Sequence, residues 1–278
     1  MNRRCFAGLF LLWVFGAMAL IGAESVPVDE NLVVLISDIH IGADAMKTGY
    51  AANNDQKLSG VIDKILAMNP RPAHVLIFGD MAYEKGTLVD YKTLIKPLFD
   101  RFDEAQIEWT AAFGNHDRRE PFGEVFPEKA QKTLLPGRLV SVVETPRCDF
   151  ILLDTLREGS VETEADAQQV EWLAAKLAEY KASGKRVYVG SHHPADVAGF
   201  LETIQNVPNV SGYIFGHWHK WSRPEIGTVP HFCLPSTAYK APPLGFMTLA
   251  LGENEDVFTL ITNDAGDENN NATWTNPF

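Results

Sequence analysis

One pattern recurs along this chain: an apolar run of strand length ends directly in side chains that bind metal ions. The run at residues 109–113 leads into Gly114-Asn115-His116-Asp117, which sets an amide, an imidazole and a carboxylate side by side. Four other runs behave in the same way and lead into Ser37-Asp38-Ile39-His40, Gly79-Asp80, Ser191-His192-His193-Pro194 and Gly216-His217-Trp218-His219. In open α/β sheets, ligands bind beyond the carboxyl ends of the strands. The pattern therefore predicts a fold that gathers these strand ends at one concave rim.

The spacing of apolar residues predicts an α/β core. Strands and helices alternate in the first part of the chain, at residues 31–37, 53–68, 74–78, 88–102 and 109–113. This alternation is typical of a sheet with crossover connections. Further elements are predicted at residues 124–134, 139–143, 150–153, 168–180, 186–189 and 210–215. Short strands without helices follow at 229–234, 245–251 and 257–262, which predicts a more antiparallel second sheet.

The chain of 278 residues contains no internal repeat and no linker that would divide it, so we expect one domain over residues 24–262. The Asn-rich segment 263–278 is expected to be a disordered tail. Residues 1–23 have the layout of a secretory signal peptide, because Arg3 and Arg4 precede a continuous apolar run.

An uncleaved membrane anchor is the competing interpretation of this N-terminal segment. The apolar run, residues 6–21, is shorter than the ~20 residues that a spanning helix needs. We therefore expect an exported protein, periplasmic or secreted, that keeps no membrane anchor after cleavage.

Charge and cysteine content limit the function classes. The net charge of −12 argues against nucleic-acid binding, which needs a basic patch, so a nuclease is a disfavoured alternative. Cys148 and Cys233 would remain after signal removal. Their spacing leaves open one disulfide or two buried thiols.

The polar clusters together offer more ligands than one tetrahedral zinc ion can use. Their side chains are Asp38, His40, Asp80, Asn115, His116, His192, His217 and His219. Oxygen and imidazole ligands without thiolates suit Mn, Fe or Zn. The set fits two metal ions that share a bridging carboxylate, a pair that can activate water against a phosphoryl centre. The histidines outside the clusters, His74 and His231, are interpreted as structural.

Taken in order, these motifs resemble those of the calcineurin-like metallophosphoesterase superfamily. The resemblance spans residues 32–262 and implies a four-layer sandwich of two mixed β-sheets flanked by helices. It also implies the role of each residue. Asp38, His40 and His219 would bind the first metal ion, Asp80 would bridge, and Asn115, His192 and His217 would bind the second. His116 would contact the phosphate and protonate the leaving oxygen.

Six further residues near these motifs have less definite roles. His193 is the less favoured ligand of the His-His-Pro motif and is expected to pack or to support a ligand. Asp117 would orient His116 or brace its turn, and bracing is the preferred interpretation. Substrate contacts are expected from Arg118 and Tyr239, with Arg119 and Lys240 as further candidates.

Two groups within the superfamily compete. The compact length, His40 and the Pro235-Ser236-Thr237-Ala238 segment resemble class III cyclic-nucleotide phosphodiesterases. The Gly-Asp-x-x-Tyr spacing that ends at Tyr83 instead resembles purple acid phosphatases, where the tyrosine binds iron. With His40 present, Tyr83 is interpreted as packing near the site.

The sequence thus predicts a dinuclear phosphoesterase that hydrolyses a phosphomonoester or a small phosphodiester, including a cyclic nucleotide, and needs two ions of Fe, Mn or Zn. The alternatives are a purple acid phosphatase-like monoesterase and a non-catalytic exported metal-binding module. The sequence makes no prediction about the oligomeric state.

Overall fold

The computed structural model describes residues 26–44, 52–163, 166–239 and 243–278. One sheet contains β1 (Val28–Ile36), β2 (Arg71–Phe78), β3 (Glu108–Ala112), β9 (Gly245–Ala250), β10 (Glu255–Thr262) and β11 (Thr273–Pro277), in the order β11-β10-β9-β1-β2-β3. The other contains β4 (Ser141–Val143), β5 (Cys148–Leu152), β6 (Arg186–Gly190), β7 (Val210–Phe215) and β8 (His231–Cys233), in that order. Each sheet combines parallel and antiparallel pairs, which confirms the predicted α/β fold with two mixed sheets.

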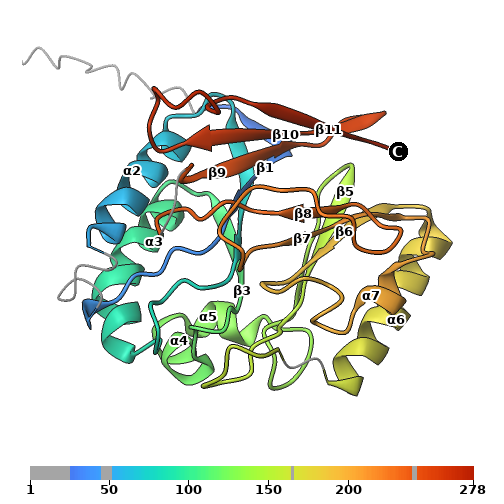
Figure 1. The fold of residues 1–278 in the computed structure, drawn as a ribbon, viewed down its shortest axis with the longest axis horizontal. Coiled ribbons are helices and arrows are strands. Elements are labelled where there is room, and N and C mark those ends of the chain that lie inside the picture. Colours follow the sequence, from blue (N-terminus) through green and yellow to red (C-terminus); the bar gives the residue numbers. More distant parts are fainter. Residues whose placement is uncertain (1–25, 45–51, 164–165, 240–242) are drawn as a thin grey trace, which may run out of the picture.

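Helices cover the outer faces of both sheets (Figure 1). The first sheet is covered by α2 (Asn54–Leu66), the π-helix η1 (Asp90–Ile95), α3 (Lys96–Glu104) and α4 (Arg119–Val125), with α5 (Pro127–Gln131) beside them. The second sheet is covered by α6 (Ala167–Ser183) and α7 (Leu201–Ile204). The region predicted as one helix at 124–134 is thus two short helices, because Pro127 starts a second one.

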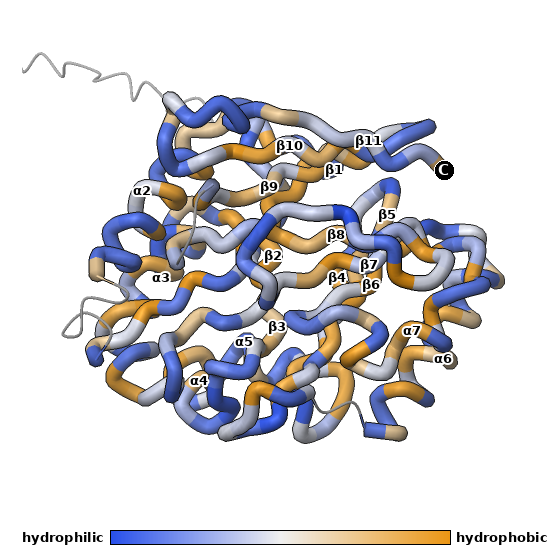
Figure 2. Tube along the Cα trace, in the orientation of Figure 1, coloured by the Kyte–Doolittle hydropathy of each residue, from blue (hydrophilic) through white to orange (hydrophobic). Residues whose placement is uncertain are grey.

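Strand alternation distributes the apolar side chains over three core layers. Along β1, Val34 and Ile36 pack toward the helices, whereas Val33 and Leu35 pack between the two sheets. A third layer joins the second sheet to α6. The apolar strands therefore lie inside the molecule, and hydrophilic segments lie mostly at its periphery (Figure 2).

The late antiparallel strands join the first sheet, so the prediction of a separate antiparallel sheet is wrong. β9 pairs with β1 through Leu32↔Ala250 and the residues that follow, and β10 pairs with β9. β8, in contrast, runs parallel to β7 in the second sheet. Alternating burial along β10 reveals one covered face, but the partner of a strand is set by non-local pairing that local periodicity does not encode.

The prediction of a disordered tail after Asn263 is also wrong. Residues 273–277 form β11, which pairs antiparallel with β10. The Trp274 ring packs against Trp221 with centroids 4.9 Å apart. The amide of Asn276 donates to Tyr188 Oη and to Ser211 O, both at 2.9 Å. The tail is ordered because it covers one edge of the sheet and anchors it to the second sheet.

Replacing Asn276 with alanine is expected to lower the free energy of unfolding by about 1–3 kcal/mol, because it leaves buried polar groups unpaired. Asn276 is 2% exposed. Urea unfolding followed by circular dichroism measures the effect, with the exposed Asn254→Ala as the matched control. Equal stability of the two variants would contradict this role of the tail.

The structure tests the prediction about the cysteines but not the prediction of a signal peptide. Cys148 and Cys233 are free, and they lie in different core layers, so the two-thiol alternative holds. The proposed signal peptide, residues 1–23, lies outside the described residues and stays a prediction. In the described part of the chain, every helix is too short or too polar to span a bilayer.

Candidate metal centre

The loops after β1 and β2 are held together by main-chain hydrogen bonds. The Asp38 amide donates to Gly79 O at 3.1 Å, and the His40 amide donates to Asp80 O at 2.9 Å. These three polar residues have positive φ angles of 53°, 51° and 49° for Asp38, His40 and Asp80. Side chains other than glycine rarely adopt this conformation, and it persists only where the surroundings enforce it. Here it turns successive carboxylate and imidazole groups toward one point.

The same backbone conformation occurs after β7, where His217 and His219 have φ angles of 65° and 59°. The His217 amide donates to both carboxylate oxygens of Asp38 at 3.1 Å, which ties the two sheets together at the site. A close approach at Gly114 explains that glycine, since a Cβ there would collide with the Asp80 carboxylate.

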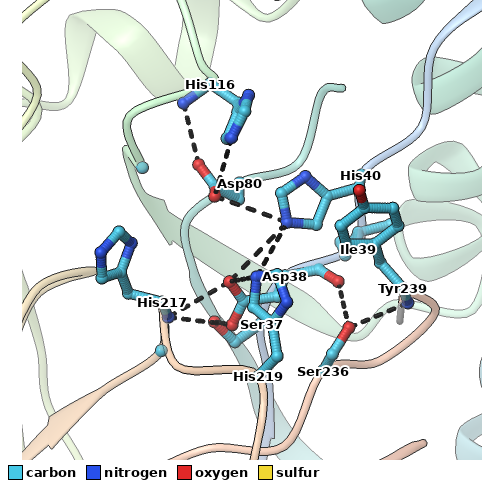
Figure 3. Close-up of polar contacts among 12 residues, drawn as sticks. Ser37, Asp38, Ile39, His40, Asp80, His116, His217, His219, Ser236 and Tyr239 are labelled. Atoms are coloured by element: carbon cyan, nitrogen blue, oxygen red, sulfur yellow. Dashed lines mark hydrogen bonds and ion pairs between the residues drawn. The ribbon is translucent and has the colours of Figure 1, made fainter. Parts of the chain in front are cut away.

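Four side chains form a first group of convergent donors: Asp38, His40, Asp80 and His219. Their ligand atoms lie within 4.8 Å of one another. His219 Nε2 is 3.1 Å from Asp38 Oδ1 and 3.2 Å from His40 Nε2. Figure 3 shows these side chains pointing toward one another from three separate loops.

A second group contains His192, His193 and His217, with ligand atoms again within 4.8 Å of one another. His217 Nδ1 and His192 Nε2 are 3.3 Å apart. Asp80 Oδ2 links the two groups, because it lies 3.2 Å from His192 Nε2 and 3.5 Å from His40 Nε2. This is the position that a bridging carboxylate requires.

The donor atoms fit metal ions. Asn115 is 5% exposed, and its Oδ1 atom has no hydrogen-bond partner among the described residues. A buried acceptor without a donor is costly unless a cation binds it. Imidazoles, carboxylates and an amide oxygen together suit Mn, Fe or Zn. Six of the seven predicted ligands therefore lie in these two groups, and the assignment of all seven to two ions stays a prediction.

Burial and charge shift the pKa values in this site. Burial disfavours the charged form of Asp80, but His192 and His40 hold its pKa well below the usual range. Burial lowers the pKa of His40 to about 3 and, together with His192, that of His217 to about 4. Burial also opposes the charging of His192, yet Asp80 and Asp38 raise its pKa to about 9. At neutral pH this raised pKa favours the protonated form of His192 in the metal-free protein.

Metal binding is expected to release about one proton per chain at pH 7, because His192 must be neutral to bind an ion through Nε2. The raised pKa keeps the proton bound below about pH 9. Affinity should therefore rise about tenfold per pH unit between pH 7 and 9 and then level off. Calorimetric titration in buffers of different ionisation enthalpy measures the proton count. Affinity that is independent of pH over this range would contradict the assignment.

His116 is one of three partly exposed imidazoles in the site, with His217 and His219. Its side chain is 28% exposed, and its Nε2 atom lies 4.0 Å from Asp80 Oδ2, too far for a hydrogen bond. Its amide donates to Asp80 Oδ1 at 2.9 Å, which fixes the loop without using the ring. The ring is thus partly open to a substrate over the metal centre, and its contact with phosphate stays a prediction.

Asp117 braces the turns rather than orienting His116. Its buried carboxylate accepts hydrogen bonds from the Gly114 amide at 2.9 Å, the Ala82 amide at 3.1 Å and Tyr91 Oη at 2.7 Å. Burial and the charge of Asp80 raise the pKa of Asp117 to about 6. The brace holds the loop after β3 against the loop after β2.

The residues expected to contact substrate lie in different surroundings. The Arg118 guanidinium lies on main-chain oxygens, 3.3 Å from Asn115 O and 2.5 Å from Asp117 O. Arg119 forms an ion pair with buried Asp154 at 2.9 Å, which gives it a structural role. Tyr239 lies at the metal centre, with its ring centroid 4.4 Å from that of His40. Lys240 lies outside the described residues.

Sequence reasoning missed the groups that support the ligands. Ser236 accepts from the Tyr239 amide and donates to Asp38 O at 2.7 Å, and Thr155 Oγ1 lies 2.8 Å from His193 Nδ1. The segment around Ser236 was noted only as a mark of resemblance. Hydroxyl groups are too common in a sequence for their partners to be predicted without the fold.

Comparisons with known proteins agree with this site. The profile of the calcineurin-like phosphoesterase family matches residues 32–221. A cAMP/cGMP dual specificity phosphodiesterase from Mycobacterium tuberculosis is 29% identical over 230 residues, which cover 77% of this chain and 69% of that protein. The 3',5'-cyclic adenosine monophosphate phosphodiesterase CpdA from Pseudomonas aeruginosa is 24% identical over 230 residues, which cover 76% of this chain and 78% of that protein.

A solved structure shares the fold. A dimetal phosphatase from Danio rerio superposes with a TM-score of 0.68 at 17% identity, covering 92% of this chain and 100% of that chain. The two-sheet sandwich and its rim of strand ends are therefore common to both proteins.

Proposed function

The chain belongs to the calcineurin-like phosphoesterase family, and we propose that it hydrolyses small phosphodiesters, with 3',5'-cyclic nucleotides as the preferred class. It is a metal-dependent phosphoester hydrolase, and the family uses a dinuclear centre. One observation carries the proposal: Asp80 Oδ2 lies between two convergent groups of donors, with His116 exposed beside it. The cyclic-nucleotide class rests on the names of the related phosphodiesterases.

When bound here, two metal ions would supply Lewis acidity and a nucleophile that is available at neutral pH. The residues of the chain would have separate roles in the reaction. Asp80 would hold the two positions at a fixed separation, and neutral Asn115 would ligate without adding negative charge. His116 would donate a proton to the leaving oxygen through its exposed ring. The closed hydrogen-bond set of Asp117 would keep both loops in register.

A substrate screen tests the proposal. Chelator-treated protein, reconstituted with Mn²⁺ or Fe²⁺, is compared on a cyclic nucleotide, a bis-aryl phosphate and an aryl monophosphate. We expect kcat/KM to be highest for the cyclic nucleotide and activity to be absent before metal is added. A preference for the monophosphate would contradict the diesterase assignment, and full activity in the chelator would contradict metal dependence.

A purple acid phosphatase-like monoesterase is the second candidate, because Tyr83 has the required spacing. Burial, together with hydrogen bonds that involve Tyr239 and Glu84, raises the pKa of the Tyr83 phenol. A phenol bound to ferric iron must lose its proton, so these surroundings disfavour that role. Iron-loaded protein should therefore lack the visible charge-transfer band of an iron phenolate, and its presence would favour the monoesterase.

Export of the chain is a further proposal, and a non-catalytic role is the remaining alternative. We propose that the chain is exported and cleaved near Ala23, which N-terminal sequencing of the mature protein tests; an intact N-terminus would contradict it. A non-catalytic metal-binding module is disfavoured, because the donor set and His116 are both present.

A further inference from the structure

His193 is a buried imidazole next to the second donor group, and the mechanism above gives it no role. It is 1% exposed, and its Nδ1 atom lies 2.8 Å from Thr155 Oγ1. Its Nε2 atom is also buried and has no hydrogen-bond partner in the part of the chain that the structure describes. Such an atom costs free energy unless something binds it.

The position of the ring supplies a second observation. The ligand atoms of His192, His193 and His217 lie within 4.8 Å of one another. The centroid of the His193 ring is 4.8 Å from that of His192 and 4.6 Å from that of His217. Imidazole nitrogens that share one ion lie about 3–4 Å apart, because each metal–nitrogen bond is about 2.0–2.1 Å. The 4.8 Å limit within which the three ligand atoms lie is close to this spacing.

The hydrogen-bond partner of His193 Nδ1 is also of the kind found beside metal-binding histidines. A histidine that binds a metal through one nitrogen usually donates its other N–H to an oxygen. His192 shows this arrangement, since its Nδ1 atom lies 2.8 Å from Phe78 O while Nε2 faces Asp80 and His217. Thr155 offers His193 the same kind of partner. In the tautomer that donates Nδ1–H to the hydroxyl oxygen, Nε2 carries a lone pair that no described group uses.

His231 shows why both observations are needed. It is also 1% exposed, its Nδ1 atom lies 2.7 Å from Val229 O, and its Nε2 atom lacks a hydrogen-bond partner among the described residues. Its neighbours are the rings of Tyr213 and Phe215, and it belongs to neither donor group. An unpaired nitrogen alone therefore does not indicate a ligand. Convergence with two other imidazoles distinguishes His193.

We propose that His193 is a third imidazole ligand of the second metal position, bound through Nε2. The proposal rests on the dinuclear site of the proposed function. It makes the two positions chemically unequal: the first has two carboxylates and two imidazoles, and the second has three imidazoles, one amide oxygen and the shared carboxylate. A site richer in nitrogen favours Zn²⁺ or Fe²⁺ over Mn²⁺ more strongly. The second position should therefore select a different ion from the first.

Metal titration of three proteins tests this role. Wild type, His193→Gln and the matched control His231→Gln are stripped with a chelator and titrated calorimetrically with Zn²⁺ and then with Mn²⁺. We expect His193→Gln to weaken Zn²⁺ binding at one of two positions by at least about tenfold, with a smaller effect on Mn²⁺. The control should keep both affinities. Thr155→Val, which retains the imidazole, should give an intermediate loss.

X-ray absorption spectroscopy of zinc-loaded wild type counts the imidazole ligands directly. It needs no substituted protein, so misfolding of a variant cannot affect the result. The spectrum should indicate a total of five imidazole ligands for the two zinc ions if His193 binds, and four if it does not. Unchanged affinities in His193→Gln, or a count of four, would overturn the role of His193 and leave the dinuclear site intact. Wild type that binds no ion would overturn both proposals.

Discussion

Replacing Asp80 with alanine is expected to reduce kcat/KM on a bis-aryl phosphate on the order of a thousandfold, which is about 4 kcal/mol of transition-state stabilisation. The carboxylate lies between both donor groups, 3.5 Å from His40 Nε2 and 3.2 Å from His192 Nε2. It also fixes the loop of His116 through a 2.9 Å hydrogen bond. Its loss removes the bridge, releases the loop and takes the nearby anion away from His40, His116 and His192. Steady-state kinetics with metal analysis of each preparation measures both consequences.

Asp149→Ala is the matched control for this substitution. Asp149 is 3% exposed and accepts a hydrogen bond from Tyr180 Oη at 2.9 Å, at the far side of the second sheet. Its removal is expected to lower the unfolding temperature without changing kcat/KM by more than about threefold. If Asp80→Ala kept two metals per chain and most of the activity, the bridging assignment would be wrong.

Replacing His116 with alanine should lower activity by about 10²–10⁴-fold on esters whose leaving group is a poor one, such as an alkoxide or a ribose hydroxyl. The ring is partly exposed and lies 4.0 Å from Asp80 Oδ2, so its loss is expected to remove a proton donor rather than a metal ligand. Esters with a nitrophenolate leaving group need no proton, and their hydrolysis should fall much less. The ratio of the two activities is the measurement that separates these roles.

Metal content provides the control for His116→Ala, since both ions should remain bound. His74→Gln serves as the matched variant, because that histidine packs against Thr110 with a 2.9 Å contact, away from the two donor groups. An equal loss on both kinds of ester, or a loss of one metal, would assign His116 to the metal centre instead.

The site was easier to predict than the sheet order, for physical reasons. An apolar run that ends in Asp38, Asp80 or His217 is local information, and parallel strands must place such ends on one rim. The strained backbone at these residues could not be predicted, because positive φ angles in Asp and His depend on bonds to distant loops. The role of Asp117 depended in the same way on Ala82 and Tyr91, which follow a different strand.

The prediction failed where long-range pairing decides the structure. Burial along β9 does not alternate regularly, and only the register of β9 with β1 assigns it to the first sheet. The asparagine content of the tail predicts disorder, yet Asn276 is buried and its side-chain amide donates two hydrogen bonds. Composition measures the average polarity of a segment, whereas one side chain with two buried partners determines whether it is ordered.

A dinuclear centre that spans both sheets is expected to hydrolyse phosphate esters only when both metal positions are filled. Stepwise addition of Mn²⁺ to the metal-free protein, with bound metal and bis-aryl phosphate hydrolysis followed in the same samples, tests it most directly. We predict that activity rises with occupancy and reaches its maximum at two ions per chain. Full activity at one ion per chain, or activity without any ion, would contradict the requirement for two metal ions.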